Sequence, residues 1–370
     1  MAIKILFFIE TLSGGGAEKV LCNLVNAMDQ SQFDITVQTL WKTDPKPYLH
    51  SGIRYRWCFA SKSRINIYRS RLEAASGLTY PLHIKGDYDI EAAYLEFGST
   101  KILSRSTNQK AKKIAWVHSD LAKRLNGHPE TQRKLEKQYK AFDRIVCVAE
   151  TTRDSFVRLF GRQSDTVVLY NTMNDTAIRD GAELPAPPLK ENADLILLAV
   201  GRLAPEKRYD MLLRVHQRLL EEGLPHQLWI VGEGPQRGKL EATITENGLQ
   251  DSVRLFGFQS NPYPFMKLAD LLVCSSSYEG LSTFVAEGLI LGKAIVTTDC
   301  SGMRELLGDS EYGLITENSE AALLSGIRQL LTDPALRSSY EARAQVRGQR
   351  FSSRQTAEKT EYFFQTLIGS

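Results

Sequence analysis

Cysteine is scarce in this chain of 370 residues, and none of its five cysteines is spaced as Cys-x-x-Cys. The sequence therefore indicates neither a zinc ribbon nor a disulfide framework. Scattered, unpaired thiols favour a reducing, cytosolic compartment. No cluster of histidine and acidic residues has metal-ligand spacing either, so we expect no obligatory metal ion.

Long hydrophobic runs are also absent. The apolar stretch 3–9 ends at Glu10 and is too short for the hydrophobic region of a signal peptide. No run approaches the roughly 18 apolar residues that cross a bilayer, so any membrane contact is expected to be peripheral. Low-complexity segments and short repeats are missing, and the composition (42% hydrophobic, 24% charged) is that of a globular protein.

Net charge is small, at +3, but it is unevenly distributed. Residues 1–185 carry 27 Lys and Arg against 20 Asp and Glu, whereas residues 186–370 carry 19 against 23. Basic residues concentrate between Lys101 and Arg144. We expect this stretch to meet anionic lipid or an anionic acceptor, with a merely solvated basic face as the alternative.

Short β-rich runs alternate with helical patterns along the chain, which predicts parallel sheets built from βαβ units. Three prolines in the segment 181–192 indicate a linker. We expect a first domain at 1–180 and a second at 190–350, followed by an amphipathic helical segment at the C-terminus. Strands are predicted at 3–9, 34–40, 89–95, 113–118, 144–148 and 166–169, then at 195–200, 227–231, 253–256, 271–275 and 294–298.

The predicted fold class is thus α/β, with two doubly wound, Rossmann-like domains facing a central cleft. Ligands of such folds bind at the carboxyl ends of the strands. The first motif in such a place is the segment 13–19, where Gly15 and Gly16 open the first helix. Missing Cβ atoms and free N–H groups favour a phosphate or sugar oxygen there. A tight turn that requires positive φ is the alternative.

Two further motifs follow predicted strands of the second domain. Arg202 and Lys207 offer a guanidinium fork and a point charge that suit a diphosphate, although Glu206 could simply pair with Lys207. Glu287 is the only charged residue between Gly280 and Gly292. A carboxylate among apolar residues needs donors, which a pair of ribose hydroxyls would supply. The alternatives are a partly exposed position or a buried pair with a cation.

Polar residues also close two strands of the first domain. His118 ends the predicted strand 113–118 and could bond a substrate hydroxyl or transfer a proton, although a lone histidine is often structural. Asn171 lies before the linker, where a polar turn is the alternative. No GxGxxG motif is present, which disfavours a nicotinamide-dependent dehydrogenase.

Together these motifs resemble the retaining glycosyltransferases of family 4, which have the two-domain GT-B fold. The segment 9–19 is similar to the family's glycine loop, 201–207 to its diphosphate clamp, and Glu279 to Glu287 to its E-x7-E signature. The resemblance covers nearly the whole chain, and it implies that a C-terminal helix at 353–370 crosses back onto the first domain. Asp87 and Asp89 match the DxD motif of other glycosyltransferases, but they precede a strand, where a turn is expected instead of a metal site.

The resemblance implies a role for each motif residue. Arg202 and Lys207 would stabilise the departing diphosphate, Glu279 would orient the donor sugar, and His118 would contact a sugar hydroxyl. Glu287 would hold the ribose hydroxyls. The other implied donor-binding positions are Gly15, Gly16, Asn171, Phe256, Phe258, Leu281, Ser282 and Thr283.

The implied activity is transfer of a hexosyl or N-acetylhexosaminyl group, with retention, from a nucleotide-diphosphate sugar to an acceptor hydroxyl. A UDP-sugar is the expected donor, with no obligatory cofactor. The expected acceptor is a glycan or polyprenyl-diphosphate-linked glycan in bacterial surface polysaccharide synthesis, at the inner face of the membrane; no nucleic acid partner is expected. A nucleotide-sugar epimerase of the same fold, or a non-catalytic nucleotide-sugar-binding subunit of a transferase complex, remains an alternative.

Overall fold

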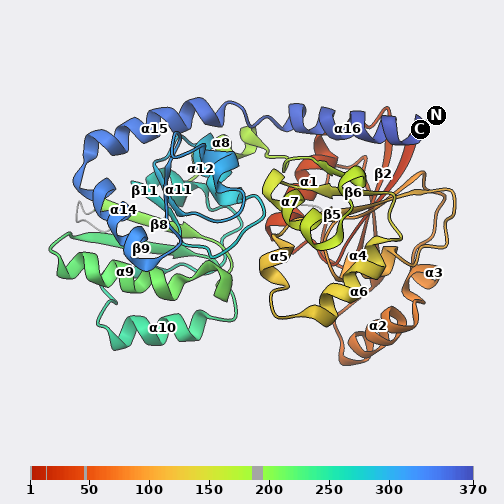
Figure 1. The fold of residues 1–370 in the computed structure, drawn as a ribbon, viewed down its shortest axis with the longest axis horizontal. Helices are drawn as coiled ribbons and strands as arrows, with labels where there is room; N and C mark the ends of the chain where they lie inside the picture. Colours follow the sequence, from red (N-terminus) through yellow and green to blue (C-terminus); the bar gives the residue numbers. More distant parts are fainter. Residues whose placement is uncertain (1, 14, 46–47, 186–194, 370) are drawn as a thin grey trace. The chain divides into compact units, whose positions relative to one another are not determined.

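The computed structural model describes residues 2–13, 15–45, 48–185 and 195–369, which form two compact units (Figure 1). Unit 1 contains the chain up to Met173 together with the residues from Ser353 onward, and unit 2 contains Asn174–Ser352. The predicted linker 181–192 lies partly outside the described residues. Its first two residues complete helix α8 (Asp175–Ala182), which packs against α11 (Tyr263–Leu268) and α12 (Thr283–Ile290). Helix α8, which the sequence assigned to the first domain, is thus part of unit 2.

Over the described residues, unit 1 has a seven-stranded parallel sheet in the order β3-β2-β1-β4-β5-β6-β7. Ile5–Ile9 of the central strand are fully inaccessible, because helices cover both faces of a parallel sheet. Strand β3 was not predicted. It is an edge strand with Arg54, Arg56 and Trp57 exposed, so it lacks the apolar run of the inner strands. The strands are β1 Ile3–Ile9, β2 Phe33–Trp41, β3 Arg54–Phe59, β4 Ile90–Ala93, β5 Lys112–Val117, β6 Arg144–Cys147 and β7 Thr166–Val168.

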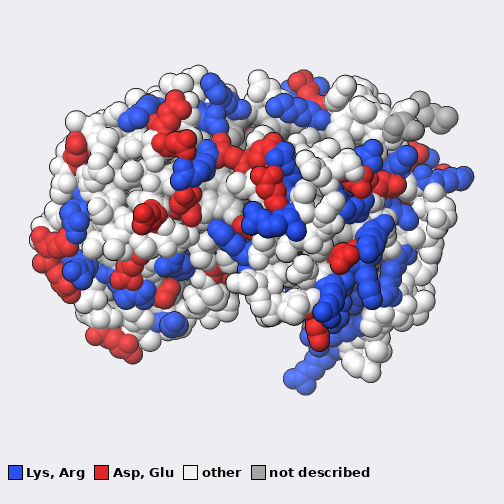
Figure 2. All heavy atoms as spheres, viewed as in Figure 1, with Lys and Arg blue, Asp and Glu red and all other residues white. Residues whose placement is uncertain are grey.

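The helices of unit 1 fill the connections between these strands. Helix α1 shows why: it buries Val20, Leu21, Leu24 and Val25, which fall on one face at helical spacing. Lys and Arg side chains gather on the part of unit 1 that carries α4 and α6 (Figure 2). The helices are α1 Gly16–Ala27, α2 Arg64–Ser76, α3 Thr79–His83, α4 Gly98–Leu103, α5 Leu121–Arg124, α6 Pro129–Tyr139, α7 Glu150–Phe160 and α16 Ser353–Gly369.

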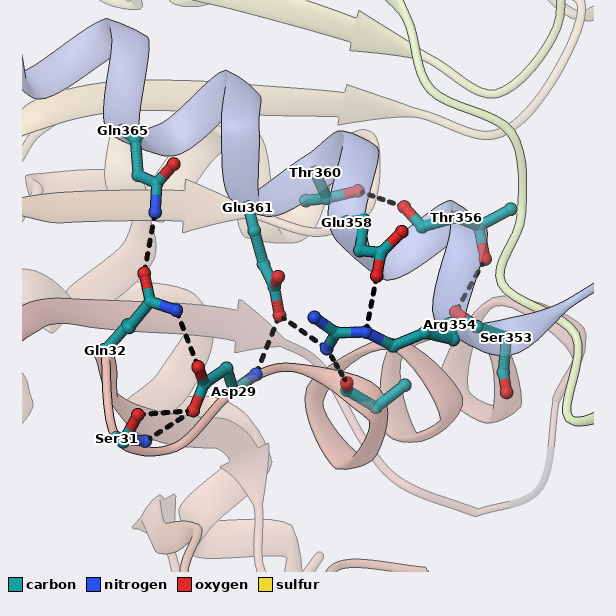
Figure 3. Close-up of polar contacts among 11 residues, drawn as sticks. Asp29, Ser31, Gln32, Ser353, Arg354, Thr356, Glu358, Thr360, Glu361 and Gln365 are labelled. Carbon is teal, nitrogen blue, oxygen red and sulfur yellow. Dashed lines mark hydrogen bonds and ion pairs between the residues drawn. The ribbon is translucent and has the colours of Figure 1, made fainter.

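The C-terminal helix α16 packs on α1 and completes the core of unit 1. Phe364 is fully buried, and its ring centroid lies 6.0 Å from that of Phe7. The buried Glu361 carboxylate accepts hydrogen bonds from the backbone N–H of Asp29 (2.7 Å) and from Arg354 Nη1 (3.4 Å) (Figure 3). The turn after α1 is thereby tied to a segment more than 300 residues away in the chain.

The same turn is organised by Asp29, whose carboxylate accepts hydrogen bonds from Ser31 and Gln32 (Figure 3). These bonds stabilise the charged form and lower the pKa of Asp29 to about 2. Gln365 Nε2 in turn donates to Gln32 Oε1 at 2.9 Å. The polar contacts of α16 therefore end on a turn that is itself hydrogen-bonded.

Unit 2 has a six-stranded parallel sheet over its described residues, in the order β10-β9-β8-β11-β12-β13. The edge strand β13 was not predicted, because three residues show no clear pattern. The strands are β8 Leu195–Val200, β9 His226–Val231, β10 Val253–Leu255, β11 Leu271–Cys274, β12 Ile295–Thr298 and β13 Leu314–Thr316. The further helices are η2 Pro205–Lys207, α9 Tyr209–Glu221, α10 Arg237–Glu246, α13 Met303–Leu307, α14 Glu320–Thr332 and α15 Pro334–Gly348.

Two histidines are in contact inside unit 2. His216 Nδ1 lies 2.8 Å from His226 Nε2, His216 Nε2 lies 2.9 Å from Ser252 Oγ, and His226 Nδ1 lies 2.8 Å from the Leu224 carbonyl oxygen. A carbonyl only accepts, so His226 carries its proton on Nδ1 and accepts at Nε2 from His216. Burial, with His226 alongside, lowers the pKa of His216 to about 3.

We expect Glu361→Ala to destabilise unit 1 by about 1–3 kcal/mol, because it leaves the partly buried backbone N–H of Asp29 without its acceptor. Urea unfolding measures the change. Glu358→Ala is the matched control, since Glu358 bonds the same arginine from an exposed position. That control should cost less than about 1 kcal/mol. Equal losses in both variants would contradict a structural role for the buried carboxylate.

We also expect unit 2 to lose stability as the pH falls from about 6.5 towards 3. The unfolded chain takes up a proton at His216 in this range and the folded chain does not, so the slope is at most about 1.4 kcal/mol per pH unit for this group. Hydrogen–deuterium exchange of the β8 and β9 amides measures the effect in unit 2 alone. His216→Gln should flatten the dependence, and His50→Gln, at an exposed position, should leave it unchanged. An unaltered slope in His216→Gln would refute this origin.

Candidate functional site

Three loops of unit 2 leave the carboxyl ends of the adjacent parallel strands β8, β11 and β12 and so emerge at one edge of the sheet. Glycines allow their backbones to approach closely. A Cβ atom on Gly302 (φ 80°) would lie 2.2 Å from the carbonyl oxygen of Gly280. One on Gly232, in the loop after β9, would lie 1.9 Å from that of Gly201. The loops at 201–208 and 275–282 are thereby supported by neighbouring backbone.

Lys207 and Glu279 meet at this edge. Lys207 Nζ lies 2.6 Å from Glu279 Oε1, and Ser276 Oγ donates to the same oxygen at 2.8 Å. Their side chains are only 21% and 15% exposed. Burial by itself lowers the pKa of Lys207, but the charge and hydrogen bond of the Glu279 carboxylate act together with Cys274 and Tyr209 to raise the pKa well above its ordinary value. Lys207 is therefore a fixed cation.

Backbone contacts hold this pair independently of the two side chains. Ser275 Oγ donates to the Lys207 carbonyl oxygen at 2.7 Å, and the Ser277 N–H donates to that of Glu206 at 2.8 Å. The carboxylate that pairs with Lys207 is thus Glu279 from the next loop, and not its neighbour Glu206. Lys207 ends the short helix η2, one residue before α9 and its first residue Tyr209.

Arg202 has a different environment. Its side chain is exposed, and among the described residues no carboxylate lies within ion-pair distance of it. It follows β8 in the same loop as Lys207. The β8 loop therefore carries one cation held by the protein and one that faces solvent, which is suited to an anionic ligand.

The residues expected on α12 lie at its amino end. Ser282 caps the helix by accepting from the Val285 N–H at 3.4 Å, Leu281 is buried and Thr283 is half-buried. Glu287 is 4% exposed, and the Tyr263 hydroxyl donates to its Oε1 at 3.2 Å. Glu287 is therefore buried and not partly exposed. No sequence signal pointed to Tyr263 as its donor.

The segment 256–258 is divided between core and solvent. The Phe256 ring packs against Trp229 and Phe265, with centroids 5.0 and 4.9 Å apart. Its N–H donates to Ile230 in the sheet, and its carbonyl accepts from Gln259. Phe258 is 53% exposed. The part of this segment that remains open to a ligand is therefore Phe258.

In unit 1 the predicted glycine loop begins α1. Gly15 is the N-cap with φ −69°, so a requirement for positive φ does not explain it, and both Gly15 and Gly16 are exposed. The Glu18 carboxylate accepts from the Gly15 N–H and from the Thr11 hydroxyl. An acid of the protein's own first helical turn thus occupies donors that were expected to face a ligand.

His118 lies at the end of β5, beside a carboxylate that the sequence did not single out. Glu96, after β4, is 2% exposed. Its Oε1 accepts from the backbone N–H groups of His118 and Ser119, both at 2.7 Å, and from Ser119 Oγ at 2.9 Å. Its Oε2 is buried and has no hydrogen-bond partner. The only signal for it was an acid directly after a predicted strand.

The His118 ring has a defined tautomer. It hydrogen-bonds the Tyr94 backbone, and Nε2 is buried without a partner, so the ring N–H that meets the carbonyl is Nδ1. Burial lowers the pKa of His118 to about 4, with Glu96 opposing the shift. His118 is therefore a neutral ring that presents an acceptor at Nε2, and Glu96, which holds the His118 backbone N–H, has its Oε2 without a partner.

The turn that carries Glu96 is strained. Phe97, the following residue, has φ 65°, which is rare for a bulky side chain. The Arg124 guanidinium lies 4.4 Å from the Phe97 ring centroid and donates from Nη1 to Ser119 Oγ at 3.3 Å. Such strain persists where the surrounding contacts impose it, and it is concentrated at functional sites.

The remaining predicted positions lie in unit 1. Asn171 is buried after β7. Asp89 Oδ2 accepts from the Lys4 N–H at 2.8 Å, which joins the amino ends of β1 and β4. Within the described ranges no three histidine, cysteine or acidic residues are grouped to hold a metal ion. In the same ranges no helix is long and apolar enough to cross a membrane.

Comparison with known proteins matches both halves of the chain to family models. Residues 14–176 match Glycosyltransferase Family 4, and residues 181–347 match Glycosyl transferases group 1. The lipopolysaccharide core biosynthesis glycosyltransferase LpsD of Rhizobium meliloti is 27% identical over 335 residues, which is 89% of this chain and 88% of the relative. A Campylobacter jejuni N-acetylgalactosamine-N,N'-diacetylbacillosaminyl-diphospho-undecaprenol 4-alpha-N-acetylgalactosaminyltransferase is 38% identical over 160 residues, which is 43% of each chain.

Solved structures share the fold over almost the full chain. HepE of Anabaena, determined in complex with UDP and glucose, superposes with a TM-score of 0.79 at 17% identity and covers 98% of this chain and 100% of its own. The sucrose-phosphate synthase of Thermosynechococcus elongatus gives 0.80 at 19% identity, covering 99% of both chains. Two parallel α/β units, both family models and these superpositions agree: this chain belongs to the family 4 glycosyltransferases and has the GT-B fold.

Proposed function

We propose that this glycosyltransferase transfers a hexosyl or N-acetylhexosaminyl group from a UDP-sugar to an acceptor hydroxyl with retention of configuration. The observation that carries the proposal is the Lys207–Glu279 pair beside the solvent-facing Arg202. Transfer from a nucleotide sugar releases a diphosphate, and fixed cations stabilise the charge that develops on it. Structures of HepE with UDP and UDP-glucose support the choice of donor.

In unit 2 we assign the donor's diphosphate to Arg202 and Lys207 and to the N–H groups at the start of α12, around Leu281, Ser282 and Thr283. Glu279 keeps Lys207 charged and in place, so that little reorganisation is needed when the leaving group forms. Glu287 takes the ribose hydroxyls and Phe258 lies against the base. No metal ion is required in this scheme.

In unit 1 we assign a sugar hydroxyl to Nε2 of His118 and a second one to Oε2 of Glu96. Both are buried acceptors without a partner, and a hydroxyl supplies the proton that each lacks. We also assign Gly15, Gly16 and Asn171 to binding of the donor sugar. Because His118 is neutral at physiological pH, it orients a hydroxyl and does not act as a cation. The leaving phosphate oxygen then helps to remove the acceptor's proton on the same face.

For the acceptor we propose a growing glycan on a polyprenyl diphosphate in bacterial surface polysaccharide synthesis, at the inner face of the membrane. The Rhizobium and Campylobacter relatives support this choice. The exposed Arg133, Lys134 and Lys137 of α6 offer charge for an anionic acceptor or lipid. An epimerase of the same fold would need no acceptor, and a non-catalytic subunit would release no nucleotide.

Nucleotide release from UDP-, GDP- and ADP-sugars, measured with and without a lipid-linked glycan, tests the proposal. We expect release of UDP that depends on the acceptor, and a loss of about 10²–10³-fold in kcat for Lys207→Ala, because a fixed cation facing the leaving group is removed. Lys267→Ala is the matched control, since Lys267 pairs with Glu183 in the same unit and is half exposed. Conversion of the donor into an epimeric nucleotide sugar without acceptor would favour the epimerase, and neither release nor conversion of any donor would favour the non-catalytic subunit.

Substitutions at His118 and Glu96 test the unit 1 assignment. His118→Asn can replace the Nδ1–H and His118→Gln the Nε2 acceptor, so we expect Gln to keep more activity than Asn. Glu96→Gln retains an oxygen for the three donors of the turn but replaces Oε2, and we expect it to raise the KM for sugar substrate about tenfold. Wild-type kcat/KM should show no His118-dependent loss between pH 7 and about 5, because the pKa of His118 lies near 4. Wild-type kinetics in Glu96→Gln would reduce Glu96 to a purely structural residue.

A further inference from the structure

Helix α2 of unit 1 exposes its apolar side. Ile65, Tyr68 and Leu72 are 78%, 68% and 53% exposed. Their spacing of three and then four residues places them on one face of the helix. Single exposed apolar residues are common on protein surfaces, but an aligned set on one helix is not.

The inward face of α2 is polar. Ser70 and Glu73 are each 7% exposed. The Glu73 carboxylate accepts from Arg69 Nε at 2.6 Å and meets His83 Nε2 of α3 at 2.7 Å. Helix α2 is therefore held to unit 1 mainly by polar contacts: Ile67 is half-buried, whereas Ile65, Tyr68 and Leu72 lie outside the core. Their exposure needs an explanation outside the folded unit.

The apolar surface extends beyond α2. Leu78, which precedes α3, and Leu82 on α3 are 50% and 49% exposed. Helix α3 packs against α2, and the two lie together at one end of unit 1 (Figure 1). We call Ile65, Tyr68, Leu72, Leu78 and Leu82 the α2–α3 face.

Positive charge surrounds this face. Lys62, Arg64 and Arg71 are exposed around its apolar residues, and the only acid between Lys62 and Lys85 is Glu73, which is buried and already paired. Two copies of the chain joined through the face would bring like charges together, which disfavours a homodimer. A partner surface that complements this face has negative charge on its outside and apolar groups below that charge.

We propose that the α2–α3 face docks on an anionic lipid bilayer. Ile65, Tyr68 and Leu72 enter the boundary between headgroups and acyl chains, and Arg64 and Arg71 meet the lipid phosphates. This inference does not rest on the proposed transfer reaction. It differs from a contact made by the basic residues of α6 alone, because apolar insertion persists when salt screens the charges.

Sedimentation of the full chain with phosphatidylcholine vesicles, with and without phosphatidylglycerol, tests the inference. We expect wild-type protein to bind the anionic vesicles and the combined variant Ile65→Ser, Tyr68→Ser, Leu72→Ser to bind them at least about tenfold more weakly. Arg64→Glu with Arg71→Glu should remove the preference for anionic lipid. The matched control is Val346→Ser with Tyr362→Ser, since these residues are 61% and 71% exposed on other helices. It should bind as wild type does.

Two further measurements separate the outcomes. UDP release from the donor in the presence of a soluble acceptor should be unchanged in the serine variant. A failed docking proposal and a failed transfer proposal therefore give different results. Charge reversal at Lys134 and Lys137 tests α6 separately, and we expect the smaller effect there. Equal vesicle binding by wild type and the serine variant would overturn the inference. So would wild-type self-association in sedimentation velocity that the serine variant abolishes, because the face would then be an interface between copies.

Discussion

The ion pair between Lys207 and Glu279 is the contact on which the chemistry of unit 2 depends. A lysine that is largely withdrawn from water loses its charge unless a carboxylate compensates. Glu279 does so from the adjacent loop, and Ser276 holds the same carboxylate oxygen. The pairing requires β8 and β11 to be neighbours and their loops to approach closely. The backbone contact of Gly280 with Gly302 supports the loop after β11. Glu279 pairs with Lys207, and Arg202 is the cation of the β8 loop whose side chain faces solvent.

In unit 1, by contrast, two buried polar atoms near His118 have no hydrogen-bond partner. Glu96 uses one oxygen to hold the turn at His118 and Ser119 and keeps the other unbonded, while His118 presents a bare acceptor at Nε2. Buried polar atoms without a partner cost stability in the absence of a ligand, and the proposed function gives these two the role of accepting hydrogen bonds from sugar hydroxyls, beside the strained Phe97. The stability is recovered elsewhere in the unit, partly through α16, whose Phe364 and Glu361 fill and close the core.

Helix α2 reverses the ordinary arrangement, since its polar side is inside and its apolar side is outside. The buried carboxylate of Glu73 is stabilised in this arrangement because it pairs with Arg69 and His83. The site residues lie at the carboxyl ends of the strands, and the exposed apolar face lies on helices that connect them. Docking and chemistry can therefore be changed separately by substitution.

The sequence by itself determined the α/β class, the inner strands and the motif positions, because a continuous apolar run marks a strand covered on both faces and β1 is such a run. It did not predict β3 or β13, since edge strands are short or exposed and lack that run. It also identified Lys207, Glu279, Glu287 and His118, because charged and polar residues at strand ends are informative on their own. Only the tertiary structure decided their partners: Glu279 for Lys207, Tyr263 for Glu287 and Glu96 for His118. These contacts join residues far apart in the chain, and strand order, which no local pattern records, brings them together.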